Sequence, residues 1–304
     1  DFGSCYGFCF AYSGNFVAGA QKDQRGLTRV QMGIHPTQFR YTLAAGEAFF
    51  APQVLMSYSS EGFTGLTHQY HDLIREHICR GAYKHAKRPV LINNWEATYF
   101  DFDKEKIVKI AQQAHELGIE MLVLDDGWFG KRDSDNSGLG DWYTNEKKMD
   151  GTMGELGDEI HALGMKFGLW FEPEMINEDS DLYRAHPDWA LRIPGREPNR
   201  GRDQLVLDMS RSEVREYLYE RISSILNEAK IDYVKWDMNR SVCDLFGHEL
   251  PPERMGELYH RFMLGVYELK ERLLAHFPQL LLEGCSGGGG RFDAGMLYYA
   301  PQIW

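Results

Sequence analysis

The sequence predicts an α/β fold: a (β/α)8 barrel, incomplete in this chain, preceded by part of an all-β sandwich domain. Two observations predict this fold class. Residues 1 to about 70 form short β-like runs broken by turn residues, whereas the chain from Pro89 onward alternates strand and helix. Each strand expected after Pro89 also ends in polar or aromatic residues, as in barrels that build their site at the strand carboxyl ends. We expect domains at residues 1–80 and 86–304, meeting near Lys87-Arg88-Pro89.

The first eighty residues are expected to form a piece of a β-sandwich followed by one helix. Turn signals such as Ser13-Gly14-Asn15, His35-Pro36 and Ala45-Gly46-Glu47 separate the β-like runs. A helical stretch is predicted from about Leu66 to Arg80. The predicted strands are Tyr6–Tyr12, Val17–Ala20, Leu27–Met32, Gln38–Leu43 and Phe49–Tyr58.

Six strands alternate with helices after Pro89. The short motif His115-Glu116-Leu117-Gly118 precedes the strand that begins at Met121. A similar motif, His161-Ala162-Leu163-Gly164, precedes the strand that begins at Lys166, which indicates that one βα unit is repeated. Asp103 is expected to cap one helix, and Ser210 with Glu213 to form a capping box for another. The predicted strands are Val90–Trp95, Met121–Asp126, Lys166–Glu172, Leu205–Asp208, Tyr233–Asp237 and Leu280–Cys285; the helices are Asp103–Leu117, Met153–Leu163, Ser210–Ala229 and Glu253–His276.

The strand ends favour a barrel over a doubly wound sheet. A doubly wound sheet concentrates its functional groups at one crossover, whereas here nearly every strand ends in such groups. Six strands do not close a barrel, and Pro301–Trp304 is expected to begin a seventh. The chain is therefore expected to stop before closure.

Composition excludes several classes of function. The net charge of −12, without a basic stripe, argues against nucleic acid as a partner. The sequence contains no run of about 18 apolar residues, so no membrane span is expected. The five cysteines show no zinc spacing, and their odd number fits a reducing, cytoplasmic location. Because Asp1-Phe2-Gly3 is neither an initiator Met nor a signal peptide, we expect the sequence to begin inside a longer protein.

Lys235 and Asp237 form the most informative pair of charges. They lie two residues apart on an expected strand, so both side chains point to one face. Buried charges are normally paired or used in function, so the pair is either a structural ion pair or an active-site carboxylate with its cation. Taken alone, the pair leaves both interpretations open.

The other strand ends favour a carbohydrate site. The cluster lacks His, which makes it a poor metal site, whereas carboxylates accept hydrogen bonds from sugar hydroxyls and indoles stack on sugar rings. The run Gly287–Gly290 lacks the Gly-Lys-Ser/Thr ending of a phosphate loop. Glycoside hydrolysis needs two carboxyl groups, and Asp237 is the expected nucleophile, held ionised by Lys235. Spacing alone does not single out the acid from among Glu172, Glu174, Glu283 and Asp293.

Five motifs resemble those of bacterial α-galactosidases of glycoside hydrolase family 36. The first eighty residues also resemble the end of that family's N-terminal sandwich, as in Tyr12-Ser13-Gly14-Asn15-Phe16. The resemblance implies a β-sandwich, a (β/α)8 barrel and a small C-terminal β-domain. It also implies retaining hydrolysis of terminal α-galactosides such as melibiose and raffinose. The motifs begin at Asn94-Trp95-Glu96, Leu124-Asp125-Asp126, Gly168-Leu169-Trp170, Lys235-Trp236-Asp237 and Glu283-Gly284-Cys285.

The resemblance assigns a role to each motif residue. It implies that Asp237 is the nucleophile and that the acid/base aspartate lies beyond Trp304. It implies no metal and no cofactor, and a homo-oligomeric, tetrameric full-length protein. The substrate-binding residues it implies are Asp125 and Asp126 for the 4- and 6-hydroxyls, Trp95 and Trp170 as pocket walls, Lys235 and Arg202 near the nucleophile, Asn239, and Cys285 and Gly288 near the 2-hydroxyl.

Other interpretations remain open at this level. A galactosyltransferase of the raffinose or stachyose synthase type shares the barrel, although the bacterial-type motifs at Asp125 and Cys285 argue against it. A non-catalytic sugar-binding fragment is the third possibility, because the expected acid is absent. Without the resemblance, Asp125 could cap a turn, Trp170 could be plain core, and Cys285 could be a small buried hydrophobe.

Overall fold

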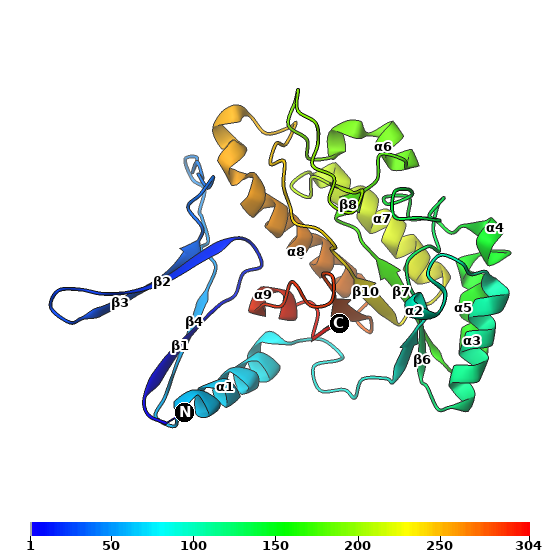
Figure 1. The fold of residues 1–304 in the computed structure, drawn as a ribbon, viewed down its shortest axis with the longest axis horizontal. Helices are drawn as coiled ribbons and strands as arrows, with labels where there is room; N and C mark the ends of the chain where they lie inside the picture. The colour runs from blue at the N-terminus through cyan, green and yellow to red at the C-terminus, as the bar shows by residue number, and fades with distance from the viewer. Residues whose placement is uncertain (1) are drawn as a thin grey trace.

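A parallel six-stranded sheet organises the larger part of the computed structural model, which describes residues 2–304 (Figure 1). Its strand order is β12-β11-β10-β7-β6-β5, so the strands of this sheet lie side by side in the order in which they occur in the chain. This is the incomplete barrel that the sequence predicts. The strands are β5 (Leu91–Asn93), β6 (Met121–Leu124), β7 (Lys166–Phe171), β10 (Tyr233–Trp236), β11 (Leu281–Gly284) and β12 (Gln302–Ile303).

Four long helices cover the outer side of this sheet, in the order α8, α7, α5, α3 (Figure 1). They are α3 (Lys104–Glu116), α5 (Met153–Ala162), α7 (Ser212–Glu228) and α8 (Leu258–His276). Asp103 caps α3 as predicted, because its side chain accepts from the backbone N–H of Lys106. The short helices are α2 (Trp95–Thr98), α4 (Glu146–Met149), α6 (Asp181–Ala185), η2 (Pro187–Trp189), η3 (Pro252–Glu257) and α9 (Ala294–Leu297).

One predicted barrel strand is wrong. Of Leu205–Asp208, only β9 (Leu205–Val206) is a strand, and it pairs antiparallel with β8 (Met175–Ile176) outside the barrel sheet. β10 therefore pairs directly with β7, and β12 is the sixth barrel strand instead of the seventh. A short apolar run is compatible with either neighbour, so the local pattern could not decide the pairing.

The capping box predicted at Ser210 and Glu213 is also wrong. The residue preceding α7 is Arg211, which makes no side-chain cap. Ser210 Oγ instead donates to Asp208 Oδ1, and Glu213 accepts from the Arg211 guanidinium at 2.7 Å. Both side chains thus have charged partners, Asp208 for Ser210 and Arg211 for Glu213. Hydrogen bonds to charged groups are stronger than those to a neutral backbone amide.

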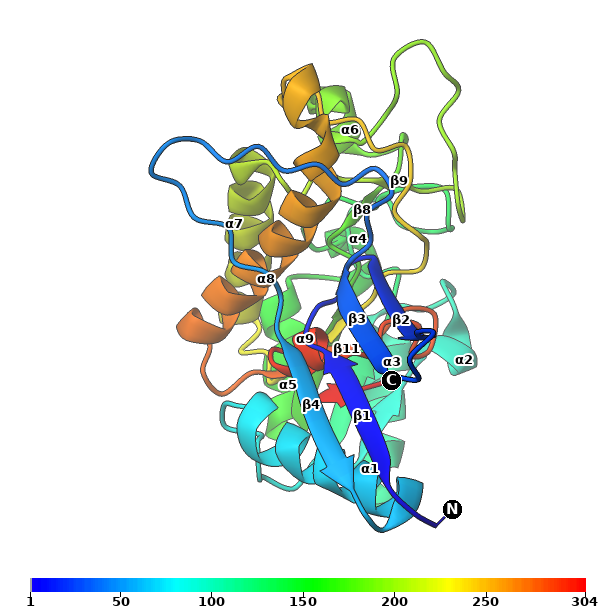
Figure 2. The same cartoon turned by 90° about the vertical axis from the view of Figure 1, so that its left-hand side faces the viewer.

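The N-terminal residues form two small antiparallel sheets beside the barrel part (Figure 2). The strand predicted at Gln38–Leu43 is absent: this segment runs along η3, with Arg40 N donating to Gly256 O. α1 packs on β1, where Tyr70 closely approaches Gly7. The sheets pair β1 (Cys5–Phe10) with β4 (Val54–Ser59) and β2 (Phe16–Lys22) with β3 (Thr28–Ile34); α1 (Gly62–Leu73) and the π-helical turn η1 (Ile74–Ile78) follow.

The N-terminal part is joined to the barrel part by buried and half-buried polar contacts. The hydroxyl of the buried Tyr12 lies 2.9 Å from His260 Nδ1 on α8. Ser13 binds Tyr267 Oη through its backbone N–H and Asp293 Oδ1 through its hydroxyl, both at 2.7 Å. These bonds connect the sandwich segment to the helices behind the last barrel strands. Within residues 2–304, no helix is both long and apolar enough to cross a membrane.

Candidate active site

Asp237 lies at the carboxyl end of β10 with its side chain held by several donors. Its Oδ2 accepts from Trp170 Nε1 at 3.1 Å and from Asn239 Nδ2 at 2.7 Å. Its Oδ1 accepts from the backbone N–H groups of Met238 at 2.9 Å and Gly287 at 3.4 Å. Protein donors therefore orient the carboxylate, and 5% of the residue's surface is exposed to solvent. A carboxylate fixed in this way is pre-organised for attack on a bound ligand.

The sequence predicts that Lys235 holds Asp237, but Lys235 pairs with a different carboxylate. Its Nζ donates to Asp125 Oδ2 at 2.9 Å and lies 4.2 Å from the centre of the Trp304 ring. Barrel geometry explains this choice, because side chains of alternate strands share one interior layer, and β6 and β10 flank β7. Burial is the largest single effect and lowers the pKa of Lys235, but Asp125, followed by Cys285 and Asp237, together hold the pKa above its ordinary value.

Asp126 is held by a residue that the sequence analysis missed. Arg132 donates to both oxygens of the Asp126 carboxylate, from Nε at 2.9 Å and from a terminal nitrogen at 2.7 Å. The arginine is 1% exposed, and its other terminal nitrogen donates to the carbonyls of Asp135 and Ser137. Burial raises the pKa of Asp126, and Arg132 offsets part of that effect. The only sequence signal was a cation six residues after the aspartate.

The four acids considered as proton donors all form hydrogen bonds or ion pairs with other protein groups. Glu174 forms a two-bond ion pair with Arg291, Glu283 accepts from Tyr233 Oη at 2.5 Å, and Asp293 caps α9. Glu172 is fully buried beside Asp237, where its two oxygens accept from the Asn239 backbone and the Gln204 amide. None of the four offers an exposed carboxyl to a ligand above Asp237.

Three of the remaining predicted site residues lie in the turns after β10 and β11. Asn239 Oδ1 accepts from Gly287 N at 3.1 Å. Cys285 is buried after β11, and burial, followed by the charge of Asp237, raises its pKa to about 12. Gly288 has φ +85° and faces open space, so a ligand could approach its backbone.

Trp95 and Arg202 occupy the surroundings of the site. Trp95 is half-buried at the start of α2 and packs edge-to-face on Tyr99 and Phe100. Arg202 is exposed, with its guanidinium 3.5 Å from Asp135. Within residues 2–304 it makes no hydrogen bond to Asp237 or Lys235, so its predicted role beside the nucleophile has no contact to support it here.

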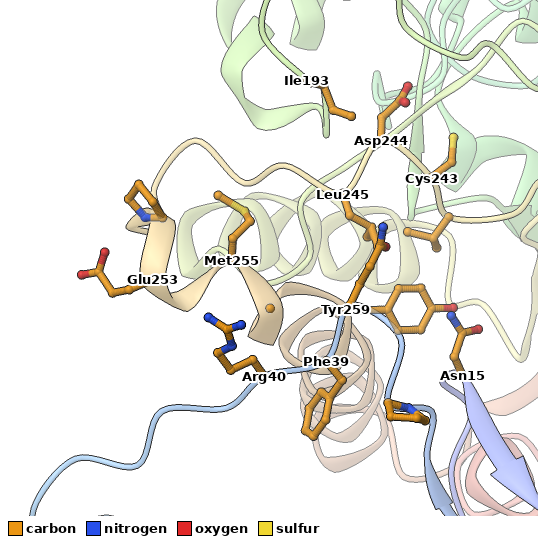
Figure 3. Close-up of a pocket in the computed structure, with 15 residues that line it drawn as sticks. Asn15, Phe39, Arg40, Ile193, Cys243, Asp244, Leu245, Glu253, Met255 and Tyr259 are labelled. Atoms are coloured by element: carbon orange, nitrogen blue, oxygen red, sulfur yellow. The ribbon is translucent and has the colours of Figure 1, made fainter.

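A hollow of about 780 Å³ lies where the N-terminal part meets α8 and the loop after β10 (Figure 3). Its wall includes Phe39 and Arg40 from the N-terminal part, Tyr259 from α8, and Cys243 and Asp244 from the loop after β10. None of the predicted site residues lines it. In the described part of the chain, no group of three or more His, Cys, Asp or Glu residues could hold a metal ion.

Fold and site together define an α/β-barrel protein with carboxylates clustered at its strand ends, where Trp170 donates to Asp237. Comparison with known sequences then identifies the family. The family model described as Melibiase matches residues 48–304, and the glycosyl hydrolase family 36 N-terminal domain matches residues 1–44. The chain belongs to the Melibiase family of glycosyl hydrolase family 36.

Close relatives agree with this assignment. The bifunctional alpha-galactosidase/sucrose kinase AgaSK of Mediterraneibacter gnavus is 58% identical over 99% of this chain and 31% of its own length. Alpha-galactosidase AgaA of Geobacillus stearothermophilus is 54% identical over 99% of this chain and 41% of its own length. The chain thus spans less than half the length of these relatives.

Solved structures of the same family superpose closely. A variant of AgaA from Geobacillus stearothermophilus in complex with raffinose has a TM-score of 0.98 and 53% identity, covering 100% of this chain and 42% of that one. Another AgaA variant, in complex with stachyose, has a TM-score of 0.97 with the same identity and coverage.

Proposed function

We propose that the protein is a retaining α-galactosidase that removes terminal non-reducing α-D-galactosyl residues from oligosaccharides of the melibiose and raffinose type. The observation that carries the proposal is the Asp237 carboxylate, fixed by Trp170, Asn239 and two backbone amides at the end of a barrel strand. Membership of the family, and the raffinose and stachyose complexes of the AgaA variants, support the substrate class.

The proposed chemistry has two displacements at the anomeric carbon. An Asp237 oxygen forms a bond to that carbon while the bond between the carbon and the leaving oxygen breaks, which gives a covalent galactosyl-aspartate. Water then attacks the same carbon, and Asp237 leaves as a carboxylate. We place the donor that protonates the leaving oxygen, and later takes the proton from water, beyond Trp304. This placement is supported by the engagement of Glu172, Glu174, Glu283 and Asp293 in protein contacts.

The remaining site residues would select galactose. The Lys235–Asp125 pair and the Asp126 carboxylate supply a donor and acceptors for sugar hydroxyls, with Trp170 and Trp95 as flat walls. Buried polar groups reject a sugar that leaves them unpaired, so these carboxylates would discriminate between epimers. Asn239, Cys285, Gly288 and Arg202 complete the proposed set.

Replacing Asp237 by Asn in the full-length protein tests the proposal. The change keeps the side-chain volume and one acceptor but removes the nucleophile, so release of nitrophenol from nitrophenyl α-galactoside should nearly vanish while galactose binding persists. The matched control is Asp232→Asn at the other end of the same strand, where the carboxylate pairs with Lys166 and His161. Retention of a tenth or more of the wild-type rate by Asp237→Asn would contradict the assignment. Transfer to added sucrose in place of hydrolysis would indicate a transferase.

We also propose a cytoplasmic homo-oligomer, tetrameric in the full-length protein, that binds neither nucleic acid nor membrane. The cysteines of the described residues are all free, which supports a reducing compartment. The acidic charge of −12 supports the absence of nucleic-acid binding. The oligomeric state rests on the family resemblance, and light scattering of the purified protein would test it.

A further inference from the structure

Glu172 joins three segments of the site with one buried carboxyl group. It directly follows β7 and is 0% exposed. Its Oε1 accepts from the backbone N–H of Asn239 at 2.5 Å, and its Oε2 accepts from Gln204 Nε2 at 3.0 Å. The end of β7, the turn after β10 and the segment leading into β9 therefore meet at this side chain.

The contact with Asn239 leads directly to the nucleophile. Asn239 Nδ2 donates to Asp237 Oδ2 at 2.7 Å, and its Oδ1 accepts from Gly287 N at 3.1 Å. The Asn239 side chain can hold Asp237 only if its own backbone is held in place. Among its described contacts, Glu172 is the group that holds the Asn239 backbone N–H.

Full burial separates Glu172 from the substrate. A general acid must reach the leaving oxygen directly or through one water, and a side chain with no exposed surface does neither. Glu172 is therefore not the missing proton donor, although its pKa would suit that role. Burial is the larger cause and the charge of Asp237 the next, and together they raise the pKa of Glu172 to about 8.

The groups facing Glu172 explain why its pKa is raised. Asp237 after β10 and Asp126 after β6 both raise the pKa of Glu172, whereas the hydrogen bonds from Asn239 lower it and only partly offset that effect. The nearby cations are engaged elsewhere: Arg132 binds Asp126, and Arg240 donates to the carbonyls of Asn199 and Gln204. No described salt bridge includes Glu172.

Gln204 is suited to partner a carboxyl group in either protonation state. Its Nε2 donates to Glu172, while its own Oε1 is buried without a hydrogen-bond partner. Rotating the amide by a half-turn places that oxygen on Glu172, where it can accept the proton of the neutral acid. An amide can thus serve the uncharged carboxyl where a lysine or arginine would force it to ionise.

We propose that Glu172 is a positioning residue that holds the Asn239 backbone, and through the Asn239 side chain the nucleophile Asp237, in place. This inference rests on the proposed function. In the second displacement Asp237 leaves as a carboxylate, and an ionised Glu172 would oppose the return of that charge. Turnover should therefore fall as the pH rises through the range in which Glu172 ionises.

Two substitutions separate the positioning role from the charge. Glu172→Gln keeps an acceptor for Asn239 and remains uncharged, and Gln204 can offer its free Oε1 to the new amide. Glu172→Leu removes the acceptor and leaves the Asn239 backbone N–H unpaired. Nitrophenyl α-galactoside is the substrate, because its good leaving group makes the second displacement limit kcat.

We expect Glu172→Gln to keep kcat within about threefold near pH 6 and to lose the decline that the wild type shows as Glu172 ionises. In kcat this decline should begin below pH 8, because Asp237 carries no charge in the covalent intermediate. Glu172→Leu should lower kcat by roughly a hundredfold with little change in KM, because a misplaced nucleophile affects the transition state more than ground-state binding. The control is Glu174→Gln, an equally buried carboxyl paired with Arg291, which should lower thermal stability but retain the alkaline decline.

A readout independent of activity is the infrared band of a protonated carboxyl group. It should be present in the wild type near pH 6, disappear above about pH 8, and be missing from Glu172→Gln. Absence of this band in the wild type, or an unchanged alkaline decline in Glu172→Gln, would overturn the inference even if Glu172→Leu fails to fold. A wild-type kcat for folded Glu172→Leu would also overturn it while the proposed function stands. Because the proton donor is placed beyond Trp304, these assays use the full-length protein, and a full-length wild type inert toward the galactoside would refute both.

Discussion

Replacing Arg132 by Met tests whether the buried ion pair with Asp126 supports the site. The methionine fills most of the space but removes both bonds to Asp126, at 2.9 and 2.7 Å, and those to the Asp135 and Ser137 carbonyls. Breaking one side of a buried ion pair typically costs about 3–5 kcal/mol, because the other charge stays buried without compensation. At about 2 °C per kcal/mol for a chain of this size, Tm should fall by roughly 6–10 °C.

The pH dependence of that loss gives a second, signed test. Burial already raises the pKa of Asp126, and removing Arg132 raises it further. A carboxyl group whose pKa is raised in the folded state costs stability at pH values above that pKa, and the cost disappears as the pH falls and the group takes up a proton. The variant should therefore be least destabilised at acidic pH and most destabilised at neutral and alkaline pH.

Thermal and denaturant unfolding at several pH values would measure both effects. The matched control is Arg184→Met on the surface of α6, where the exposed guanidinium pairs with Asp179 and Asp181. Exposed pairs contribute little, so this variant should unfold close to the wild-type temperature. An unfolding free energy of Arg132→Met equal to that of Arg184→Met, or a loss independent of pH, would refute the reasoning.

Two further predictions concern buried positions under the site. Lys270→Met should stabilise the protein by about 1 kcal/mol, because it removes a fully buried amine that has no hydrogen-bond partner. Burial places the pKa of Lys270 well below its ordinary value, so the stability of the wild type should rise toward alkaline pH. This dependence on pH should be smaller in the variant. A variant less stable than the wild type would show that the contact between Lys270 Nζ and the Trp236 ring, at 3.8 Å, outweighs the cost of burying the amine. Gly168→Ala on β7 should cost roughly 1–3 kcal/mol, since the added methyl group would lie 2.5 Å from the Tyr233 ring. Gly284→Ala on β11 is its control, because the nearest atoms there are 3.9 Å away; equal denaturation midpoints for the two would contradict the packing argument.

The sequence by itself determined the strand and helix alternation and the strand ends at which the site lies. Asp125, Trp170 and Asp237 were found because each follows or ends an apolar run that forms a barrel strand. Such runs and caps are local properties, written in consecutive residues. The same local information gave the Asp103 cap of α3 and the repeated helix end before β7.

Only the tertiary structure decided which groups meet. Lys235 shares a strand face with Asp237, yet it pairs with Asp125, because the barrel interior brings side chains of alternate strands into one layer. Leu205–Val206 pairs with β8 outside the barrel, a choice of neighbour that its own residues do not encode. Arg132 and Glu172 gain their roles from burial beside particular partners. Pairing, burial and the pKa shifts that follow depend on distances between residues remote in the chain, which a linear pattern does not contain.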